Sequence, residues 1–140
     1  MIKIRLAKIK DCKKCAELSR IEELRPAGSD FISGGYFRIF IDKDELFFVA
    51  EYDGEVVGYI LGEPMKGNMA NLGLSTVNST LRGKGIGKKL VEAFRKKCDE
   101  KGLKYILLYA PKFNKNTLEF YKKCGFKEGK GHIQFLEIRG

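Results

Sequence analysis

The chain has 140 residues, a length typical of a single domain with one hydrophobic core. Hydrophobic residues make up 44% and charged residues 32%, a composition that excludes a disordered chain and indicates a globular one. No stretch has the 18 or so apolar residues of a membrane span, and the first five residues alternate charge where a signal peptide would be apolar. We therefore expect one domain over residues 1–140, a cytoplasmic location and no membrane partner.

The net charge of +9 is unevenly distributed along the chain. Residues 82–104 contain nine basic and three acidic side chains, whereas residues 32–81 contain three basic and seven acidic ones. The basic segment begins where the glycines cluster, which indicates a polyanionic ligand such as a phosphate-bearing cofactor or a nucleic acid. A solvated, lysine-rich surface is the alternative explanation.

The cysteine and histidine pattern argues against a metal cofactor. Cys12 and Cys15 form a C-x-x-C motif, but Cys98 and Cys124 stand far apart and supply no second close pair. His132 is the only histidine, which excludes a site with several histidines. We expect free thiols, with the cysteines at 15 and 98 in the core.

The first third of the chain predicts a strand, a helix and an irregular segment. Residues 2–7 alternate apolar and charged side chains, as a half-buried strand does. Asp11 is expected as the N-cap of a helix over residues 12–24. Residues 26–41 are rich in glycine and aromatic residues, and we interpret them as irregular or weakly helical and suited to face a substrate.

The middle of the chain predicts a hairpin whose strands are buried on both faces. The apolar runs 46–52 and 56–61 flank Asp53 and Gly54, two residues that tolerate the positive φ angles of a tight turn. Their continuous hydrophobicity, like that of residues 105–110, indicates helices above and below the sheet. The fold class is therefore α/β (α+β) with a mixed sheet.

The remaining predicted elements alternate strand and helix. Residues 69–78 are predicted as a strand, 86–101 as a helix, 115–123 as a second helix and 133–138 as a final strand. The helix over 86–101 carries one apolar stripe, formed by Ile86, Leu90, Val91, Phe94 and Cys98.

A glycine-rich turn lies between the strand over 69–78 and the helix that follows. Its backbone N–H groups and the helix N-terminus would face an anion, and four basic side chains add charge. The spacing is one residue too short for a P-loop, and a dinucleotide-binding turn would need a third glycine where Lys88 stands.

The same turn fits a third phosphate-binding design. Arg82, Gly85 and Gly87 match the pattern [QR]-x-x-G-x-[GA]. The opening I-R-x-A-x-x-x-D ends at Asp11, and N-x-x-T-x-x-F-Y-x-x-x-G-F begins at Asn114. In this order the motifs resemble the GNAT superfamily of N-acetyltransferases. The resemblance implies a single GNAT-like domain, with a mostly antiparallel sheet, helices on both faces and a splayed central strand pair.

The resemblance also implies a cosubstrate, acetyl-CoA, and its binding residues. Asn114 would bond to the pantetheine region, and Tyr121 would be the general acid that protonates the departing thiolate, a role that suits a phenol. The strand would pair with the pantetheine arm and the turn would hold the pyrophosphate; the residues concerned are Ser75, Thr76, Val77, Arg82, Gly83, Lys84, Gly85, Ile86, Gly87 and Lys88.

A general base of the usual kind is missing. Residues 65–90 contain no Asp, Glu or His, and Tyr109 stands where relatives that acetylate protein N-termini carry a glutamate. Glu63 is the nearest candidate base by sequence. Less favoured candidates are Glu51, Glu22, Glu23 and His132, and an ordered water that relays the proton is an equal alternative.

Our leading hypothesis is an enzyme that moves an acetyl group from acetyl-CoA, without a metal, to the primary amine of a small molecule or a lysine side chain. The alternatives are a non-catalytic acyl-CoA-binding domain and a protein N-terminal acetyltransferase. A nucleic-acid-binding module is the least favoured, because no such motif accompanies the basic charge. The resemblance further implies a possible homodimer.

Overall fold

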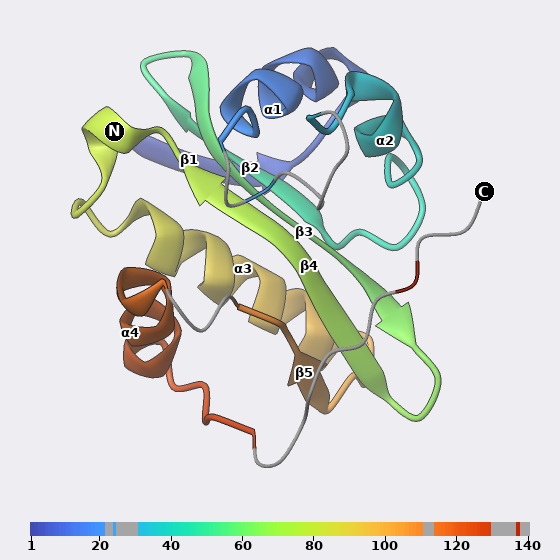
Figure 1. Ribbon diagram of the computed structural model, residues 1–140. Coiled ribbons are helices and arrows are strands. Elements are labelled where there is room, and N and C mark those ends of the chain that lie inside the picture. Colours follow the sequence, from blue (N-terminus) through green and yellow to red (C-terminus); the bar gives the residue numbers. More distant parts are fainter. Residues whose placement is uncertain (22–23, 25–30, 111–113, 130–136, 138–140) are drawn as a thin grey trace. The chain divides into compact units, whose positions relative to one another are not determined.

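The computed structural model describes residues 1–21, 24, 31–110, 114–129 and 137 (Figure 1). Two compact units divide the chain, Met1–Tyr109 and Ala110–Gly140, and each is described by itself. In the described ranges no helix is both long and apolar enough to cross a membrane. The strand predicted over 133–138 and the histidine at 132 lie outside the described residues.

The first unit is built on a five-stranded mixed sheet. The strands lie in chain order: β1 (Ile2–Leu6), β2 (Phe47–Tyr52), β3 (Glu55–Met65), β4 (Met69–Val77) and β5 (Tyr105–Leu107). All neighbouring pairs are antiparallel except β4 and β5, which are parallel. The predicted hairpin is confirmed, with φ of 51° at Asp53 and 81° at Gly54.

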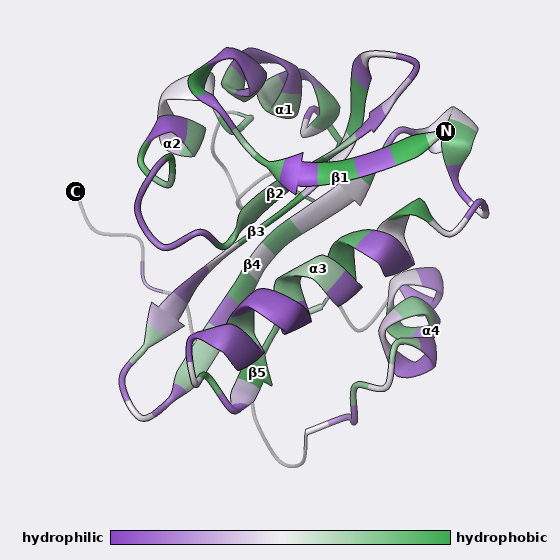
Figure 2. Ribbon diagram, turned by 180° about the vertical axis from the view of Figure 1, so that it is seen from behind, coloured by the Kyte–Doolittle hydropathy of each residue, from purple (hydrophilic) through white to green (hydrophobic). Residues whose placement is uncertain are grey.

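Helices cover both faces of the sheet, as the sequence predicts. The short helices α1 (Cys12–Leu18) and α2 (Gly34–Arg38) lie over one face and α3 (Ile86–Glu100) over the other (Figure 1). All five residues of the predicted stripe on α3 are buried, while hydrophilic residues form bands on its outer side (Figure 2). Under α1 and α2 the core contains three rings in mutual contact, those of Phe37, Phe47 and Tyr59.

The N-terminal helix is shorter than predicted, because a distant partner ends it. α1 stops at Leu18, and the Ser19 hydroxyl donates to the Cys15 carbonyl at 2.6 Å. The same hydroxyl lies 2.5 Å from the phenol oxygen of buried Tyr59. A serine side chain that bonds to the carbonyl of the preceding helical turn disfavours continuation of the helix. Here Tyr59 of β3 holds the Ser19 hydroxyl in this position.

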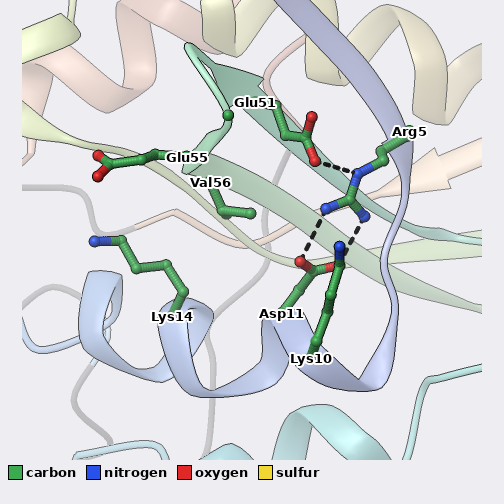
Figure 3. A pocket seen from close by; sticks show the side chains of 8 residues that line it. Arg5, Lys10, Asp11, Lys14, Glu51, Glu55 and Val56 are labelled. Atoms are coloured by element: carbon green, nitrogen blue, oxygen red, sulfur yellow. Dashed lines mark hydrogen bonds and ion pairs between the residues drawn. The ribbon is translucent and has the colours of Figure 1, made fainter.

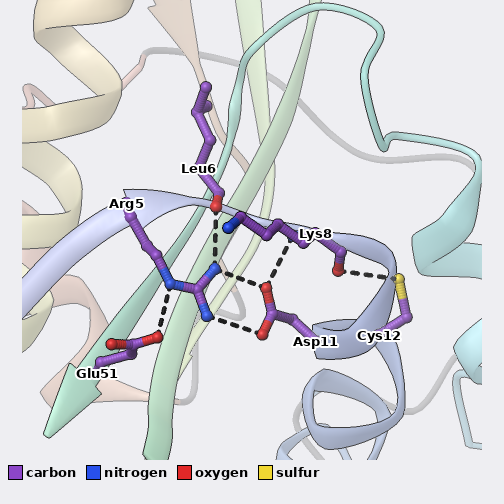
Figure 4. Close-up of polar contacts among 6 residues, drawn as sticks. All are labelled: Arg5, Leu6, Lys8, Asp11, Cys12 and Glu51. Atoms are coloured by element: carbon purple, nitrogen blue, oxygen red, sulfur yellow. Dashed lines mark hydrogen bonds and ion pairs between the residues drawn. The ribbon is translucent and has the colours of Figure 1, made fainter. Parts of the chain in front are cut away.

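Asp11 occupies the N-cap position of α1, as the sequence predicts, but its side chain does not cap the helix. Its side chain makes no cap hydrogen bond to α1 and instead faces Arg5, whose guanidinium donates to both carboxylate oxygens at 2.8 and 2.9 Å (Figure 4). Lys8 adds a backbone N–H at 2.7 Å, and Glu51 accepts from the Nε of the arginine at 2.6 Å (Figure 4). This network fastens β1 to β2 and to the start of α1.

The network forms the wall of a cavity of about 300 Å³ on the surface (Figure 3). Burial opposes ionisation of Asp11, but the guanidinium and the Lys8 N–H outweigh it and lower the pKa of the carboxyl. Because Arg5, Asp11 and Glu51 in this wall pair with one another, we assign the network a structural role.

The strand predicted over residues 105–110 is also only partly confirmed. β5 spans Tyr105–Leu107, and Tyr105 is 63% exposed, so this strand is not covered on both faces within the described residues. All four cysteines are buried free thiols, as predicted. Burial raises the pKa of the Cys12 and Cys15 thiols, which leaves them as unreactive core residues.

Candidate functional site

The sheet opens between β4 and β5. Only Met69, Ala70 and Asn71 of β4 pair with β5, although β4 continues to Val77 against β3. Among the described residues, no strand pairs with the β5 side of residues 72–77. Ser75, Thr76 and Val77, the predicted pantetheine-binding residues, therefore lie on an open backbone edge that can bond to an extended ligand.

A β-bulge marks the point where the strands separate. Leu61 pairs with Leu74 and Gly62 with Leu72, so Gly73 is an extra residue in β4. A bulge leaves its extra residue unpaired and turns its peptide groups away from the regular ladder. The bulge therefore places backbone donors at the closed end of the opening.

The glycine-rich turn follows β4 and is held by its own hydrogen bonds. The Leu81 N–H donates to the Asn78 carbonyl at 2.9 Å, and the Arg82 Nε donates to the Val77 carbonyl at 3.3 Å. Gly83 and Gly85 have φ of 82° and 80°, a region that other residues enter at a cost. An added Cβ would meet no atom within 4 Å at either glycine, so both line open space.

The turn leads into α3 and carries uncompensated positive charge. Gly85 is the N-cap of α3 and makes no side-chain cap, so the first N–H groups of this 15-residue helix remain available to an anion. Four basic side chains surround the turn, and among the described residues none forms an ion pair: Arg82, Lys84, Lys88 and Lys89. Charge and geometry both match a phosphate group.

In the second unit, α4 spans Lys115–Lys123, the predicted range. Asn114 is its N-cap, and its side-chain oxygen accepts from the Thr117 N–H at 3.2 Å. This bond fixes the carboxamide and leaves its NH₂ group as a donor that bonds to none of the described residues. The predicted role of Asn114 toward pantetheine would use that donor.

The end of α4 explains why a tyrosine, a glycine and a phenylalanine occur at the spacing Y-x-x-x-G-F. Gly125 has φ of 95° and donates to the Lys122 carbonyl at 2.9 Å, while Phe126 donates to the Tyr121 carbonyl at 3.0 Å. This is a Schellman motif, in which a hydrophobic contact accompanies the two bonds. Here the contact joins Tyr121 and Phe126, whose rings are 5.6 Å apart and nearly perpendicular.

Glu63 lies on β3, exposed, two residues before the strand ends. Its cross-strand partner is Asn71 on β4. Burial and then the negative charge of Glu63 raise the pKa of Tyr36 on α2.

Asn71 and Tyr36 did not emerge from the sequence as site residues. The signal for Asn71 was weak but present, because it is a polar residue between two apolar residues of a strand that is otherwise largely apolar. In the described residues no cluster of three or more His, Cys, Asp or Glu could hold a metal ion.

The site is thus an anion-binding turn at one end of an open strand edge, with a bulge at the other end. A model of the acetyltransferase (GNAT) family matches residues 11–126. The chain belongs to this family. Members of the family use acetyl-CoA.

Known proteins resemble this GNAT chain in sequence and in structure. An uncharacterized N-acetyltransferase of Methanocaldococcus jannaschii is 31% identical over 100 residues, which are 66% of this chain and 44% of the relative. A mycothiol acetyltransferase of Amycolatopsis mediterranei is 30% identical over 106 residues, 70% of this chain and 35% of the relative. The chain therefore spans less than half the length of these two curated relatives.

The crystal structure of Ard1 from Thermoplasma volcanium has a TM-score of 0.76 and 25% identity, and the match covers 90% of this chain and 82% of that one. AAC(6')-Iy, solved with a bisubstrate analogue that contains CoA, has a TM-score of 0.80, with coverage of 100% of this chain and 99% of that one. Its 18% identity shows the shared fold alone.

Proposed function

We propose that this protein is an acetyl-CoA-dependent N-acetyltransferase that acts on the primary amine of a small molecule or of a lysine side chain. The observation that carries the proposal is the unpaired positive turn at residues 82–88, which directly follows the open edge of β4. A ligand with phosphates at one end and an amide-containing arm at the other matches both features in order.

Binding follows from these two features. The N–H groups of the turn and the first turn of α3 would hold the pyrophosphate, with Arg82, Lys84 and Lys88 adding charge. The open edge at Ser75, Thr76 and Val77 would pair with the amides of the pantetheine arm. The arm would then extend along β4 from the turn toward the bulge at residue 73.

The reaction would be a direct attack of a neutral amine on the thioester carbon. Acetyl-CoA supplies the activated acetyl group, and the residues of this chain orient it and move protons. Glu63 would take a proton from the incoming ammonium, directly or through a water. Backbone N–H groups at the bulge would stabilise the oxyanion, and Tyr121 would give its phenolic proton to the sulfur as the C–S bond breaks. The nitrogen would lose its second proton as the amide forms, and that proton would return through solvent to the Tyr121 phenolate.

Two other functions are compatible with the same fold. β4 has no Asp, Glu or His, which favours a non-catalytic acyl-CoA-binding domain as the second candidate. An acetyltransferase for protein N-termini is the third candidate. Tyr109, at the position where such relatives carry a glutamate, argues against the third candidate.

Release of free CoA thiol, measured with and without a panel of primary amines, tests the proposal. We expect amine-dependent release that falls at least about ten-fold in Tyr121→Phe, because the leaving thiolate loses its proton donor. The affinity for acetyl-CoA, measured by calorimetry, should stay within two-fold. Tyr52→Phe, at a tyrosine of β2 that is not among the proposed site residues, is the matched control and should behave as the parent. Binding without amine-dependent release from any amine or lysine peptide would favour the acyl-CoA-binding domain.

A further inference from the structure

The inference in this subsection rests on the proposed function and concerns the acceptor amine. One face of the sheet is closed to an acceptor. A Cβ added to Gly62 would meet the ring of Phe94 on α3 at 2.5 Å, so α3 packs directly on the strands at this level. Ala70 and Leu72, which alternate with Asn71 along β4, are buried, at 0% and 4% exposure. An amine must therefore approach the bulge from the face that carries α1 and α2.

On that open face two polar side chains lie directly opposite each other. Glu63 of β3 pairs with Asn71 of β4, and paired residues of antiparallel strands project on the same side of the sheet. Glu63 is exposed and Asn71 is partly buried. The next residues toward the hairpin end, Met65 and Met69, are apolar and paired with each other. Asn71 is also the last residue of β4 that pairs with β5, so the polar pair lies where β4 and β5 separate.

Asn71 lies next to the bulge. Its amide nitrogen is 3.9 Å from the position that a Cβ on Gly73 would take. Among the described residues, the side chain of Asn71 has no hydrogen-bond partner. A half-buried carboxamide without a partner, beside the backbone donors proposed for the thioester, is available to a substrate.

Tyr36 completes the group from α2. α2 covers the same face of the sheet (Figure 1), and burial and then the charge of Glu63 raise the pKa of the Tyr36 phenol. Tyr36 is 42% exposed, and its ring packs against that of Phe40 with centroids 5.2 Å apart. Because burial and Glu63 both keep this phenol neutral, its oxygen can accept a hydrogen bond.

We propose that Asn71, Glu63 and Tyr36 form the acceptor subsite, and that the subsite binds the protonated head of a primary alkylamine. An alkylammonium ion has three N–H donors and no acceptor. The Glu63 carboxylate, the Asn71 carbonyl oxygen and the Tyr36 hydroxyl oxygen supply one acceptor each. Transfer of one proton to Glu63 leaves a neutral amine, held by Asn71 beside the bulge with its lone pair free to attack. Each further alkyl group on nitrogen removes one N–H, so the subsite selects primary amines.

The test uses the full chain with CoA, which cannot transfer an acetyl group, and n-butylammonium as the probe. NMR follows the side-chain amide of Asn71, which is assigned by its loss in Asn71→Ala. We expect a saturable shift of this amide with n-butylammonium and none with n-butyltrimethylammonium, which has no N–H. Glu63→Gln should raise the dissociation constant about ten-fold, as loss of a charge-assisted bond does. Glu55→Gln, at the other end of the same strand, should leave it unchanged.

The outcomes separate this subsite from the proposed function. Binding of CoA without a saturable shift at Asn71, equal shifts with the two ammonium ions, or equal affinities in Glu63→Gln and Glu55→Gln would overturn the subsite alone. A parent protein that binds neither CoA nor acetyl-CoA in calorimetry would overturn both.

Discussion

Replacing Gly85 with alanine should weaken acetyl-CoA binding far more than it weakens the fold. Gly85 has φ of 80°, and an added Cβ would meet no protein atom within 4 Å. The substitution therefore lowers the free energy of unfolding only through the strain of an alanine at a positive φ angle. This strain is about 1 kcal/mol, which corresponds to a fall in Tm of about 4 °C. The same Cβ would occupy the space where we place the pyrophosphate. We expect the dissociation constant to rise at least about ten-fold, or 1.4 kcal/mol.

Gly102 supplies a matched control for this experiment. It has φ of 73° and also has no atom within 4 Å of an added Cβ, but it follows the C-terminus of α3 instead of preceding the N-terminus. Gly102→Ala should therefore lower Tm by a similar amount and leave acetyl-CoA affinity unchanged. Calorimetric titration and thermal unfolding of the two variants measure both quantities. Equal affinities in Gly85→Ala, Gly102→Ala and the parent would refute the location of the pyrophosphate.

Five further substitutions test the fold and the site. Asp11→Asn should cost about 3 kcal/mol at pH 7 in urea unfolding, since it breaks the buried pair with Arg5. Because that pair lowers the pKa of Asp11 below 3.8, its stabilisation is present above pH 4 and lost below it, so the variant should lose less stability on acidification than the parent. Gly62→Ala should cost about 3 kcal/mol through overlap with α3, whereas Gly73→Ala, with no neighbour of its Cβ closer than 3.6 Å, should cost under 1 kcal/mol; equal stabilities would contradict the packing. Phe126→Ala should lower kcat about ten-fold with acetyl-CoA affinity unchanged, because the ring orients the proposed general acid, and Phe126→Leu should recover part of the rate.

Local patterns predicted those parts of the fold that depend on neighbours in sequence. The turn at Asp53 and Gly54 needs only two residues that accept positive φ, and the apolar stripe on α3 needs only helical periodicity. The bounds of α4 were also predicted, because Asn114 caps its start and Gly125 its end. In each of these cases the residues that determine the structure are close together in the sequence.

Features that depend on distant partners could not be predicted in this way. α1 ends where Ser19 meets Tyr59, which is 40 residues away in sequence. Asp11 is at the N-cap of α1, but its carboxylate bonds to Arg5 of β1 instead of to the helix. Each pairing follows from the register of the folded sheet, which the local sequence pattern does not specify.

The candidate site likewise has features that depend on local sequence and features that depend on distant partners. The glycine turn was predictable, because positive φ and basic charge are visible in the sequence. The pairing of Glu63 with Asn71 was not, because a bulge and a strand register bring them together. That the two compact units act as one domain, with Tyr121 serving the site on β4, remains a prediction.

The central claim is that this chain transfers an acetyl group to an amine, and a labelled cosubstrate tests it most directly. The purified protein would be incubated with acetyl-CoA labelled with ¹³C in the acetyl group and with a pool of primary amines and lysine peptides. Mass spectrometry and thiol detection would then follow the label and the free CoA. We predict a labelled amide that forms in step with free CoA and that is lost in Tyr121→Phe. Acetyl-CoA that binds but remains intact in the presence of every amine would contradict the claim.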